Sequence, residues 1–333
     1  MEQFSYVIAL EDTEERVDKW ISDTLPDISR SYIQKLIKDQ LVFVNRVPCK
    51  ANYRLKLNDE ILFQIPQAVE PEILPEDLKL DILYEDEDVL VVNKPKNMVV
   101  HPAPGHYSGT LVNGVLYHCH GQLSGINGVL RPGIVHRIDK DTTGSVIICK
   151  NDIAHRSIAE QLKNHSIVRR YHAIVTGNLK DDEGTIEGPI GRHPTDRKKM
   201  AIHSKNGKPA ITHYKVIERL RGYTYVECAL ETGRTHQIRV HMQSIGHPLL
   251  GDTVYGTEKQ PYKTDGQVLH AKVLGFMHPV TGEYIETDAP LPMYFQDLLQ
   301  KLLFISCHNF LDVFLLAWLK YIKEIRLKMI LFR

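Results

Sequence analysis

Apolar residues recur at helical spacing in two segments near the start of the chain. The positions are Val17, Trp20 and Ile21 in the first segment and Tyr32, Ile33, Leu36 and Ile37 in the second. Residues three or four apart share one face of an α-helix, so each segment predicts a helix with a buried side. We expect Thr13 to cap the first helix and Ser29 the second, because a hydroxyl can accept a hydrogen bond from a free N–H of the first turn. The apolar run 42–44 predicts a short strand.

Farther along the chain, most apolar residues form short runs that are typical of β-strands. The runs are 81–84, 89–92, 145–149, 171–175 and 224–230. Residues 152–162 have helical spacing instead, with Asp152 as the expected cap. Many strands with few helices between them predict an α+β fold whose main domain is a large mixed, mostly antiparallel sheet. The first part of the chain would form a separate, small α/β domain.

Proline and acidic residues mark the boundary between the two domains. Residues 66–79 contain Pro66, Pro71 and Pro75 among clustered acids, with few apolar side chains. This composition is typical of an extended linker. We therefore expect a small domain at 13–65, a linker at 66–79, a main domain at 80–301 and an atypical tail at 302–333. Within the tail, residues 310–319 are apolar, but the stretch falls short of the roughly twenty residues that a membrane span needs.

Charge is segregated along the chain although the net charge is zero. Residues 28–57 hold seven Lys or Arg and one acid, whereas residues 58–88 hold eleven acids and one Lys. A second basic block spans 192–208. Basic blocks on a neutral protein suit a polyanionic partner that binds at particular faces.

The second predicted helix carries cations that are well placed for such a partner. Arg30, Gln34 and Lys38 lie at i, i+4 and i+8 and form a ridge opposite the apolar stripe. The run Ser-Arg-Ser-Tyr-Ile-Gln-Lys-Leu-Ile at 29–37, with the strand that follows it, resembles the S4 domain of RNA-binding proteins. The resemblance implies phosphate contacts, which position RNA without reading its sequence. The contacts expected here are Arg30, Lys35 and Lys38.

Several classes of site lack their sequence signature. The five cysteines stand at 49, 119, 149, 228 and 307, and no two of them form a Cys-x-x-Cys pair. This spacing excludes a zinc knuckle or ribbon and favours a reducing compartment, the cytoplasm. The glycines of 105–128 match neither a P-loop nor a dinucleotide fingerprint, so we expect no nucleotide cofactor. Residues 1–10 do not resemble a signal peptide, and we expect neither a metal ion nor a membrane partner.

The stretch 131–150 holds the most distinctive candidate for chemistry. A Pro-Gly turn precedes the extended segment 134–139, which puts Val135, Arg137 and Asp139 on one side. The turn signal Asp-Thr-Thr-Gly follows, and then a buried strand. A carboxylate therefore leaves an extended segment beside an arginine, just before a tight turn. Taken alone, the pattern also fits an ordinary surface turn, because such turns favour Asp.

Two motifs resemble the signatures of RluA/RluD-type pseudouridine synthases. Residues 136–144, His-Arg-Ile-Asp-Lys-Asp-Thr-Thr-Gly, match the family's His-Arg-Leu-Asp-x-x-Thr-Ser-Gly with two mild replacements. Residues 232–241, Thr-Gly-Arg-Thr-His-Gln-Ile-Arg-Val-His, match the family's second signature without a break. The resemblance runs from residue 13 to about residue 300, and the tail does not share it. It implies isomerisation of uridine to pseudouridine in RNA, without metal, redox cofactor or energy donor.

The resemblance also implies roles for single residues. Asp139 would be the essential carboxylate, acting on the ribose or on the base, with Arg239 as the opposite charge that keeps it ionised. Tyr171 would stack on the flipped base. The RNA contacts implied in the main domain are Arg137, which would fill the space vacated by the base, His136 and Arg234. The implied substrate is 23S-type large-subunit ribosomal RNA, bound by a monomer, although similar proteins act on transfer RNA.

Three other functions compete with this interpretation. A metal-dependent hydrolase would use His236 with His241, or His136 with Asp139, but the chain has no His-Glu-x-x-His motif. A glycosidase would pair Asp139 with Asp141, although the turn after Asp139 should divert the second carboxylate. A non-catalytic ribosome-assembly factor would need only the S4-like module, and the two intact signatures argue against it.

Overall fold

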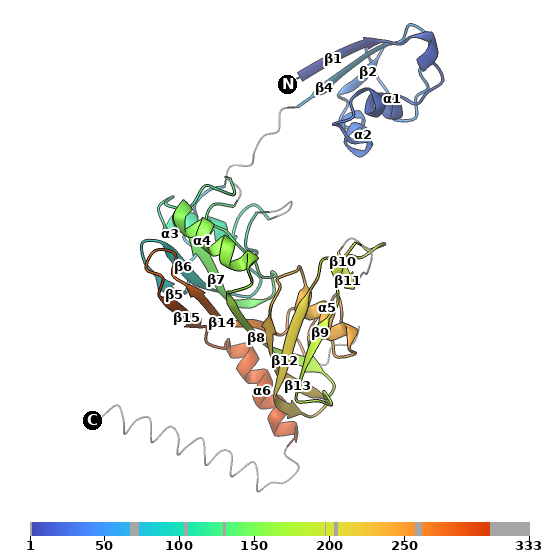
Figure 1. Ribbon diagram of the computed structural model, residues 1–333. Coiled ribbons are helices and arrows are strands. Elements are labelled where there is room, and N and C mark those ends of the chain that lie inside the picture. Colours follow the sequence, from blue (N-terminus) through green and yellow to red (C-terminus); the bar gives the residue numbers. More distant parts are fainter. Residues whose placement is uncertain are drawn as a thin grey trace, which may run out of the picture. The chain divides into compact units, whose positions relative to one another are not determined.

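The computed structural model describes residues 2–66, 73–102, 106–128, 131–196, 198–202, 206–256 and 262–306. The chain forms two compact units, Met1–Glu72 and Ile73–Arg333 (Figure 1). Within the described ranges, no helix is long and apolar enough to cross a membrane. The apolar stretch 310–319 lies outside those ranges.

The small unit combines a four-stranded sheet with two helices. The antiparallel strands lie in the order β1 (Glu2–Val7), β4 (Glu60–Ile65), β2 (Val42–Val44) and β3 (Val47–Pro48). A 3₁₀ turn, η1 (Leu10–Asp12), precedes the helices α1 (Val17–Thr24) and α2 (Arg30–Lys38). Trp20, Ile33 and Phe63 share one core, so the predicted apolar helix faces are confirmed. The strand β1, which we did not predict, pairs Phe4 with Phe63 and extends the unit to residue 2 instead of 13.

The two helices of the small unit begin in different ways. Ser29 caps α2 as expected, since its hydroxyl accepts a hydrogen bond from the Tyr32 N–H (3.4 Å). The expected cap at Thr13 is wrong, because its hydroxyl donates to a carbonyl of the preceding 3₁₀ turn. The first N–H of α1, on Val17, donates instead to the Tyr53 carbonyl (2.9 Å). That partner is distant in sequence, so no local pattern could indicate it.

A buried carboxylate organises the basic side of the small unit. The Asp18 side chain is fully buried and accepts hydrogen bonds from Arg16, Arg30 and Gln34 at 2.7–3.1 Å. Burial alone would raise the pKa of Asp18, but hydrogen bonds from Arg30 and Arg16 lower it to about 2. Arg30 is thus held by a residue of α1, whereas the two lysines of α2 are exposed and unrestrained by this carboxylate.

The linker is shorter than the sequence suggests. Ile73 is 8% exposed and belongs to the main core of the larger unit. The Asn113 side chain donates to the Leu74 carbonyl (2.8 Å), and the Glu76 carboxylate accepts from the Gly109 N–H. Residues 73–79, expected in the linker, therefore pack on the larger unit.

A nine-stranded sheet is the framework of the larger unit. The strand order is β5 (Ile82–Glu85), β6 (Val89–Lys94), β7 (Thr143–Cys149), β14 (Leu269–Met277), β8 (Val168–Thr176), β13 (Tyr223–Leu230), β12 (Ile211–Leu220) and β9 (Glu183–Glu187), and β15 (Tyr284–Asp288) pairs with β14. All pairs are antiparallel except β7 with β14 (Figure 1). This sheet confirms the predicted α+β fold.

Helices and a small hairpin surround the sheet. In the described part of the larger unit, the helices are α3 (Leu111–His118), α4 (Asp152–Lys163), α5 (Gln237–Ser244) and α6 (Met293–Ser306). The hairpin joins β10 (Ile190–Arg192) to β11 (Met200–Ile202). The cap of α4 is Asn151, whose side chain accepts from the Ala154 N–H (2.9 Å). Asp152, the expected cap, is the first helical residue.

The larger unit extends beyond the boundary expected at residue 301. Helix α6 crosses that boundary, and Leu302 is buried in the same apolar cluster as Phe295. The start of the expected tail, residues 302–306, is therefore part of the domain. The rest of the tail, 307–333, lies outside the described residues.

Gly144 sets the spacing of the two parallel strands. β7 and β14 pair through Thr143 with His270 and Gly144 with Ala271. Gly144 has a φ of +107°, and a Cβ at this position would lie 2.3 Å from the Ala271 carbonyl oxygen. Only glycine permits such a close approach of two backbones. The pairing anchors the end of the 136–144 motif in the middle of the sheet.

Candidate active site

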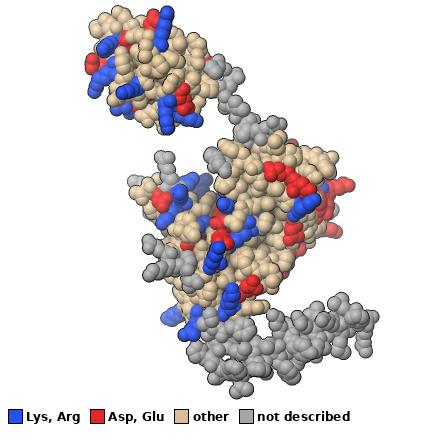
Figure 2. Space-filling model, turned by 180° about the vertical axis from the view of Figure 1, so that it is seen from behind, with Lys and Arg blue, Asp and Glu red and all other residues tan. Residues whose placement is uncertain are grey.

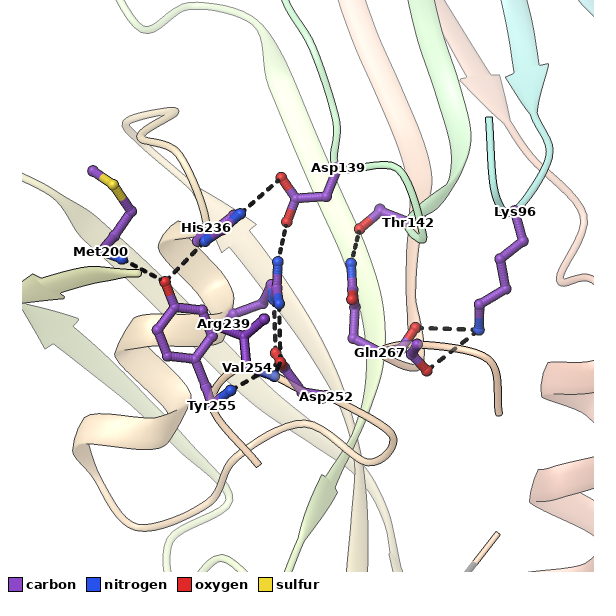
Figure 3. Close-up of polar contacts among 11 residues, drawn as sticks. Lys96, Asp139, Thr142, Met200, His236, Arg239, Asp252, Val254, Tyr255 and Gln267 are labelled. Carbon is purple, nitrogen blue, oxygen red and sulfur yellow. Dashed lines mark hydrogen bonds and ion pairs between the residues drawn. The ribbon is translucent and has the colours of Figure 1, made fainter. Parts of the chain in front are cut away.

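Asp139 lies at the end of the extended segment 134–139, directly before a turn. The Thr142 N–H donates to the Asp139 carbonyl (3.1 Å) and closes the turn. The Thr142 hydroxyl accepts from the Gln267 amide (3.1 Å), which ties the turn to the chain before β14 (Figure 3). The Asp139 side chain remains 21% exposed. Its carboxylate is thus held in place and is still accessible.

A buried lysine fixes the same turn from another strand. Lys94, the last residue of β6, is fully buried and donates to the carbonyls of Pro95 (2.9 Å), Met98 (2.8 Å) and Lys140 (3.0 Å). Three ammonium hydrogens thereby meet three acceptors. Burial lowers the pKa of Lys94 to about 7, an effect that the nearby aspartates oppose. Lys94 therefore restrains the residue that follows Asp139.

Arg239, on α5, lies between two carboxylates that are far apart in the sequence. Its Nη1 is 2.9 Å from Asp139 Oδ2 (Figure 3). Its Nε and Nη2 donate to the two oxygens of Asp252 at 2.6 and 2.9 Å. Asp252 is fully buried and also accepts from the N–H groups of Val254 and Tyr255. The two motifs are thus brought together through Asp139 and Arg239, and Asp252 orients the guanidinium.

The opposite charges of Arg239 and the two carboxylates stabilise one another. Burial alone would lower the pKa of Arg239, but Asp252, and to a lesser extent Asp139, raise it. Burial would likewise raise the pKa of Asp252, and the hydrogen bonds and charge of Arg239 lower it. The buried guanidinium therefore stays charged beside Asp139.

His236 faces the second oxygen of Asp139. Its Nε2 lies 3.8 Å from Asp139 Oδ1, and its Nδ1 lies 2.8 Å from the Tyr255 hydroxyl (Figure 3). That hydroxyl accepts a hydrogen bond from the Met200 N–H (2.7 Å), and the Tyr255 ring centre is 5.1 Å from the Arg239 guanidinium carbon. Tyr255 therefore contacts both His236 and Arg239, the two residues that face the oxygens of Asp139.

Residues of both motifs line one pocket with a tyrosine from the middle of the sheet. The lining includes Asp139, Arg137, Arg234 and His236, together with Tyr171 from β8. Tyr171 is 8% exposed, and burial raises the pKa of its hydroxyl. The pocket thus combines a carboxylate, cations and an aromatic ring, which suits a planar heterocycle attached to an anionic chain.

The three RNA contacts expected in the larger unit have different surroundings. Arg137 is exposed, and its guanidinium lies 3.0 Å from Nε2 of His101. Arg234 donates to a backbone carbonyl and lines the pocket. His136 is not among the residues that line the pocket. Its Nε2 accepts a hydrogen bond from the Ile147 N–H (3.0 Å). Burial, with the charge of a nearby arginine, lowers the pKa of His136 to about 4. This neutral, internally bonded ring does not suit the expected contact with RNA.

The groups needed by a metal-dependent hydrolase or a glycosidase are not assembled in this pocket. His241 is fully buried with its Nδ1 bonded to Thr212, and Asp141 is not part of the lining. Elsewhere in the described residues, one group could offer metal ligands: Asp86, Asp88 and His278. Nδ1 of His278 accepts from backbone N–H groups and Nε2 donates to Asp86 (2.8 Å), so neither ring nitrogen is free to bind a metal.

Several residues around Asp139 were not among the expected site residues. They are Lys94, Asp252, Tyr255 and Gln267, and His236 was considered only as a metal ligand. Two signals are available in the sequence: the 232–241 motif contains His236, and the run Gly-His-Pro-Leu-Leu-Gly-Asp at 246–252, also part of the family pattern, ends at Asp252. Neither signal indicates that these side chains reach Asp139, and only the folded chain brings them there.

Comparison with known proteins identifies the family of this chain. The family model described as RNA pseudouridylate synthase matches residues 88–244, and the S4 domain model matches residues 15–61. The chain is 52% identical over 302 residues to the uncharacterized RNA pseudouridine synthase YlyB of Bacillus subtilis, covering 91% of this chain and 99% of that protein. It is 46% identical to ribosomal large subunit pseudouridine synthase D of Zymomonas mobilis, covering 88% and 95%.

A solved structure is similar as well. Human RNA pseudouridylate synthase domain containing 1 aligns with a TM-score of 0.53 and 27% identity, covering 70% of this chain and 97% of that one. The fold, the two motifs and the sequence matches all point to the same family. The chain therefore belongs to the RNA pseudouridine synthase family, isomerases that act on RNA, and carries an S4 domain at its N-terminal end.

Proposed function

We propose that this enzyme converts uridine to pseudouridine in large-subunit ribosomal RNA, with Asp139 as the catalytic carboxylate. The observation that carries the proposal is the pocket that Asp139, paired with Arg239, lines together with Tyr171. An ionised, fixed carboxylate can stabilise charge at a glycosidic carbon or attack it. The N1–C1′ bond breaks, the uracil turns, and C5 bonds to C1′; the C5 proton is released to solvent and N1 takes up a proton.

The uridine enters this pocket after leaving its stack. A base inside an RNA stem cannot reach a carboxylate in a pocket unless it is extruded. Tyr171, buried at the pocket wall, offers a ring on which the extruded base stacks. Arg137 is exposed at the pocket rim and fills the vacated space in the RNA.

The substrate class is supported by relatives and by charge. Several relatives are named ribosomal large subunit pseudouridine synthase D. Lys and Arg side chains project from the small unit, and acidic side chains of the larger unit gather on the side where β5 and β15 lie (Figure 2). RNA thus contacts the S4 domain and the basic rim of the pocket, away from the acidic side. The protein works as a monomer in the cytoplasm, where its substrate is made.

Tritium release tests this proposal. RNA transcribed with uridine tritiated at C5 loses the label when C5 is substituted. We expect release from large-subunit ribosomal RNA and none from transfer RNA. Release from transfer RNA alone would contradict the substrate class, and tight binding without any release would favour an assembly factor.

Neutralising the α2 lysines should weaken RNA binding in a salt-dependent way. Lys35 and Lys38 are exposed, so Lys35→Gln with Lys38→Gln removes two phosphate contacts without disturbing the core. We expect the slope of log affinity against log salt to fall by about 2, with turnover at saturating RNA unchanged. The control Lys163→Gln with Lys301→Gln makes the same charge change on α4 and α6. Equal slopes in both double variants would show that α2 does not bind RNA.

A further inference from the structure

The contacts of His236 determine which of its ring nitrogens carries the proton. The Tyr255 hydroxyl accepts from the Met200 N–H (2.7 Å) and lies 2.8 Å from His236 Nδ1. The hydroxyl has one hydrogen to donate, and in the part of the chain that the structure describes, His236 Nδ1 is the acceptor within hydrogen-bond distance of it. The proton of the neutral imidazole then resides on Nε2.

The position of Asp139 favours the same tautomer. Nε2 faces Asp139 Oδ1 at 3.8 Å, and a bare lone pair directed at a carboxylate would be repelled. Burial lowers the pKa of His236, an effect that the charge of Asp139 opposes. The neutral imidazole, with its proton on Nε2, can thus donate a hydrogen bond to the carboxylate without being positively charged.

The loop around His236 is rigid enough to maintain this arrangement. His236 adopts a left-handed conformation (φ +58°) immediately before α5. The Gln237 side chain accepts from the Thr232 hydroxyl (2.8 Å) and the Arg234 N–H (2.9 Å), which braces the turn. The backbone from which the ring projects is thus held by these contacts, and the Tyr255 hydroxyl contacts the ring itself.

Two donors from the start of α5, His236 and Arg239, therefore face the two oxygens of Asp139. Arg239 donates to Oδ2 at 2.9 Å, whereas Nε2 of His236 is about 1 Å too far from Oδ1 for a hydrogen bond. Catalytic hydrogen bonds that are long in the free enzyme often shorten in the substrate complex. The two side chains need to approach each other by about 1 Å to form this hydrogen bond.

We propose that Tyr255 and His236 are positioning residues: Tyr255 keeps the His236 proton on Nε2, and His236 then donates to Asp139 Oδ1 when uridine binds. The carboxylate is thereby held at both oxygens, by Arg239 and by His236, and cannot turn away from the ribose. This inference rests on the proposed function, in which Asp139 is the reacting group.

Kinetics of Tyr255→Phe provide the first test. The variant keeps the ring against Arg239 and His236 and removes only the hydroxyl. We expect kcat for tritium release to fall about 10-fold, with KM within about twofold, because the contact matters after RNA is bound. The control Tyr284→Phe removes an exposed hydroxyl that donates to Glu286 and should leave both constants unchanged.

Two further variants separate this role from a general structural one. In a His236→Ala background, Tyr255→Phe should cause no additional loss, because the two residues act in series. His236→Gln supplies an amide hydrogen that needs no tautomer, so it should retain most of the activity and make it insensitive to Tyr255→Phe. Additive losses in the His236→Ala background would overturn the proposal.

Nitrogen NMR of the full-length protein with ¹⁵N-labelled histidine tests the tautomer directly. The His236 resonances are identified by their absence in His236→Gln. We expect the Nε2–H form in the wild type and a mixture of both forms in Tyr255→Phe. An unchanged tautomer in Tyr255→Phe would overturn the inference. Wild-type turnover by Asp139→Asn would instead overturn the proposed function, whatever the tautomer.

Discussion

Asp139→Asn is expected to lower turnover by at least about 1,000-fold, because an amide can neither attack C1′ nor balance charge there. The fold should be retained. Arg239 keeps both hydrogen bonds to Asp252, so no buried cation is left unpaired. RNA affinity should stay within about twofold of wild type, since phosphate contacts made elsewhere supply most of the binding energy. Tritium release and a salt-dependent binding titration measure the two properties.

The neighbouring carboxylate provides the matched control. Asp141 lies two residues from Asp139 at the same turn, and it is not part of the pocket lining. Asp141→Asn makes the same chemical change and should retain turnover within about tenfold of wild type. An equal loss in both variants would indicate a shared role of the two carboxylates, as in a glycosidase. Full activity of Asp139→Asn would rule out Asp139 as the catalytic group.

Arg239→Met is expected to destabilise the larger unit by about 3–5 kcal/mol and to abolish turnover. The substitution leaves the fully buried carboxylate of Asp252 without its cation, and an uncompensated buried charge is costly. It also removes the hydrogen bond that holds Oδ2 of Asp139. Urea unfolding measures the first effect, and tritium release measures the second.

A double variant separates stability from activity. Arg239→Met with Asp252→Asn removes both charges, and the asparagine can still accept from the Val254 and Tyr255 N–H groups that Asp252 binds. We expect most of the lost stability to return while turnover stays absent. If turnover returned with stability, Arg239 would have only a structural role. If stability did not return, the loss would not come from the charge of Asp252.

The confirmed predictions depend on local periodicity. The apolar stripes of α1 and α2 and the buried strand β7 follow from spacings of three to four residues or from a short continuous run. The Ser29 cap is also local, because its partner is three residues away. The strand β1 had a readable signal in the alternation of Phe4 and Tyr6 with polar residues. Its partner, β4, is about sixty residues away.

The errors arose where a distant partner replaces a local one. Thr13 has the right chemistry for a cap, but Tyr53 occupies the first N–H of α1. Residues 73–79 have the composition of a linker, but the cost of their polarity is offset by the burial of Ile73 and by hydrogen bonds to α3 and the loop before it. Composition predicts whether an isolated segment stays extended and solvated. It does not reveal whether another part of the folded chain packs against that segment.

The sequence by itself determined the family, the fold class and the identity of Asp139 and Arg239 as candidates, because the two motifs are contiguous and keep their residue order. Only the tertiary structure decided how the carboxylate is held. Asp252 and Tyr255 reach the site from one loop, Gln267 from the chain before β14, and Lys94 from β6. Hydrogen bonds depend on distances of about 3 Å between atoms, and long-range strand pairing, not local pattern, brings these atoms together.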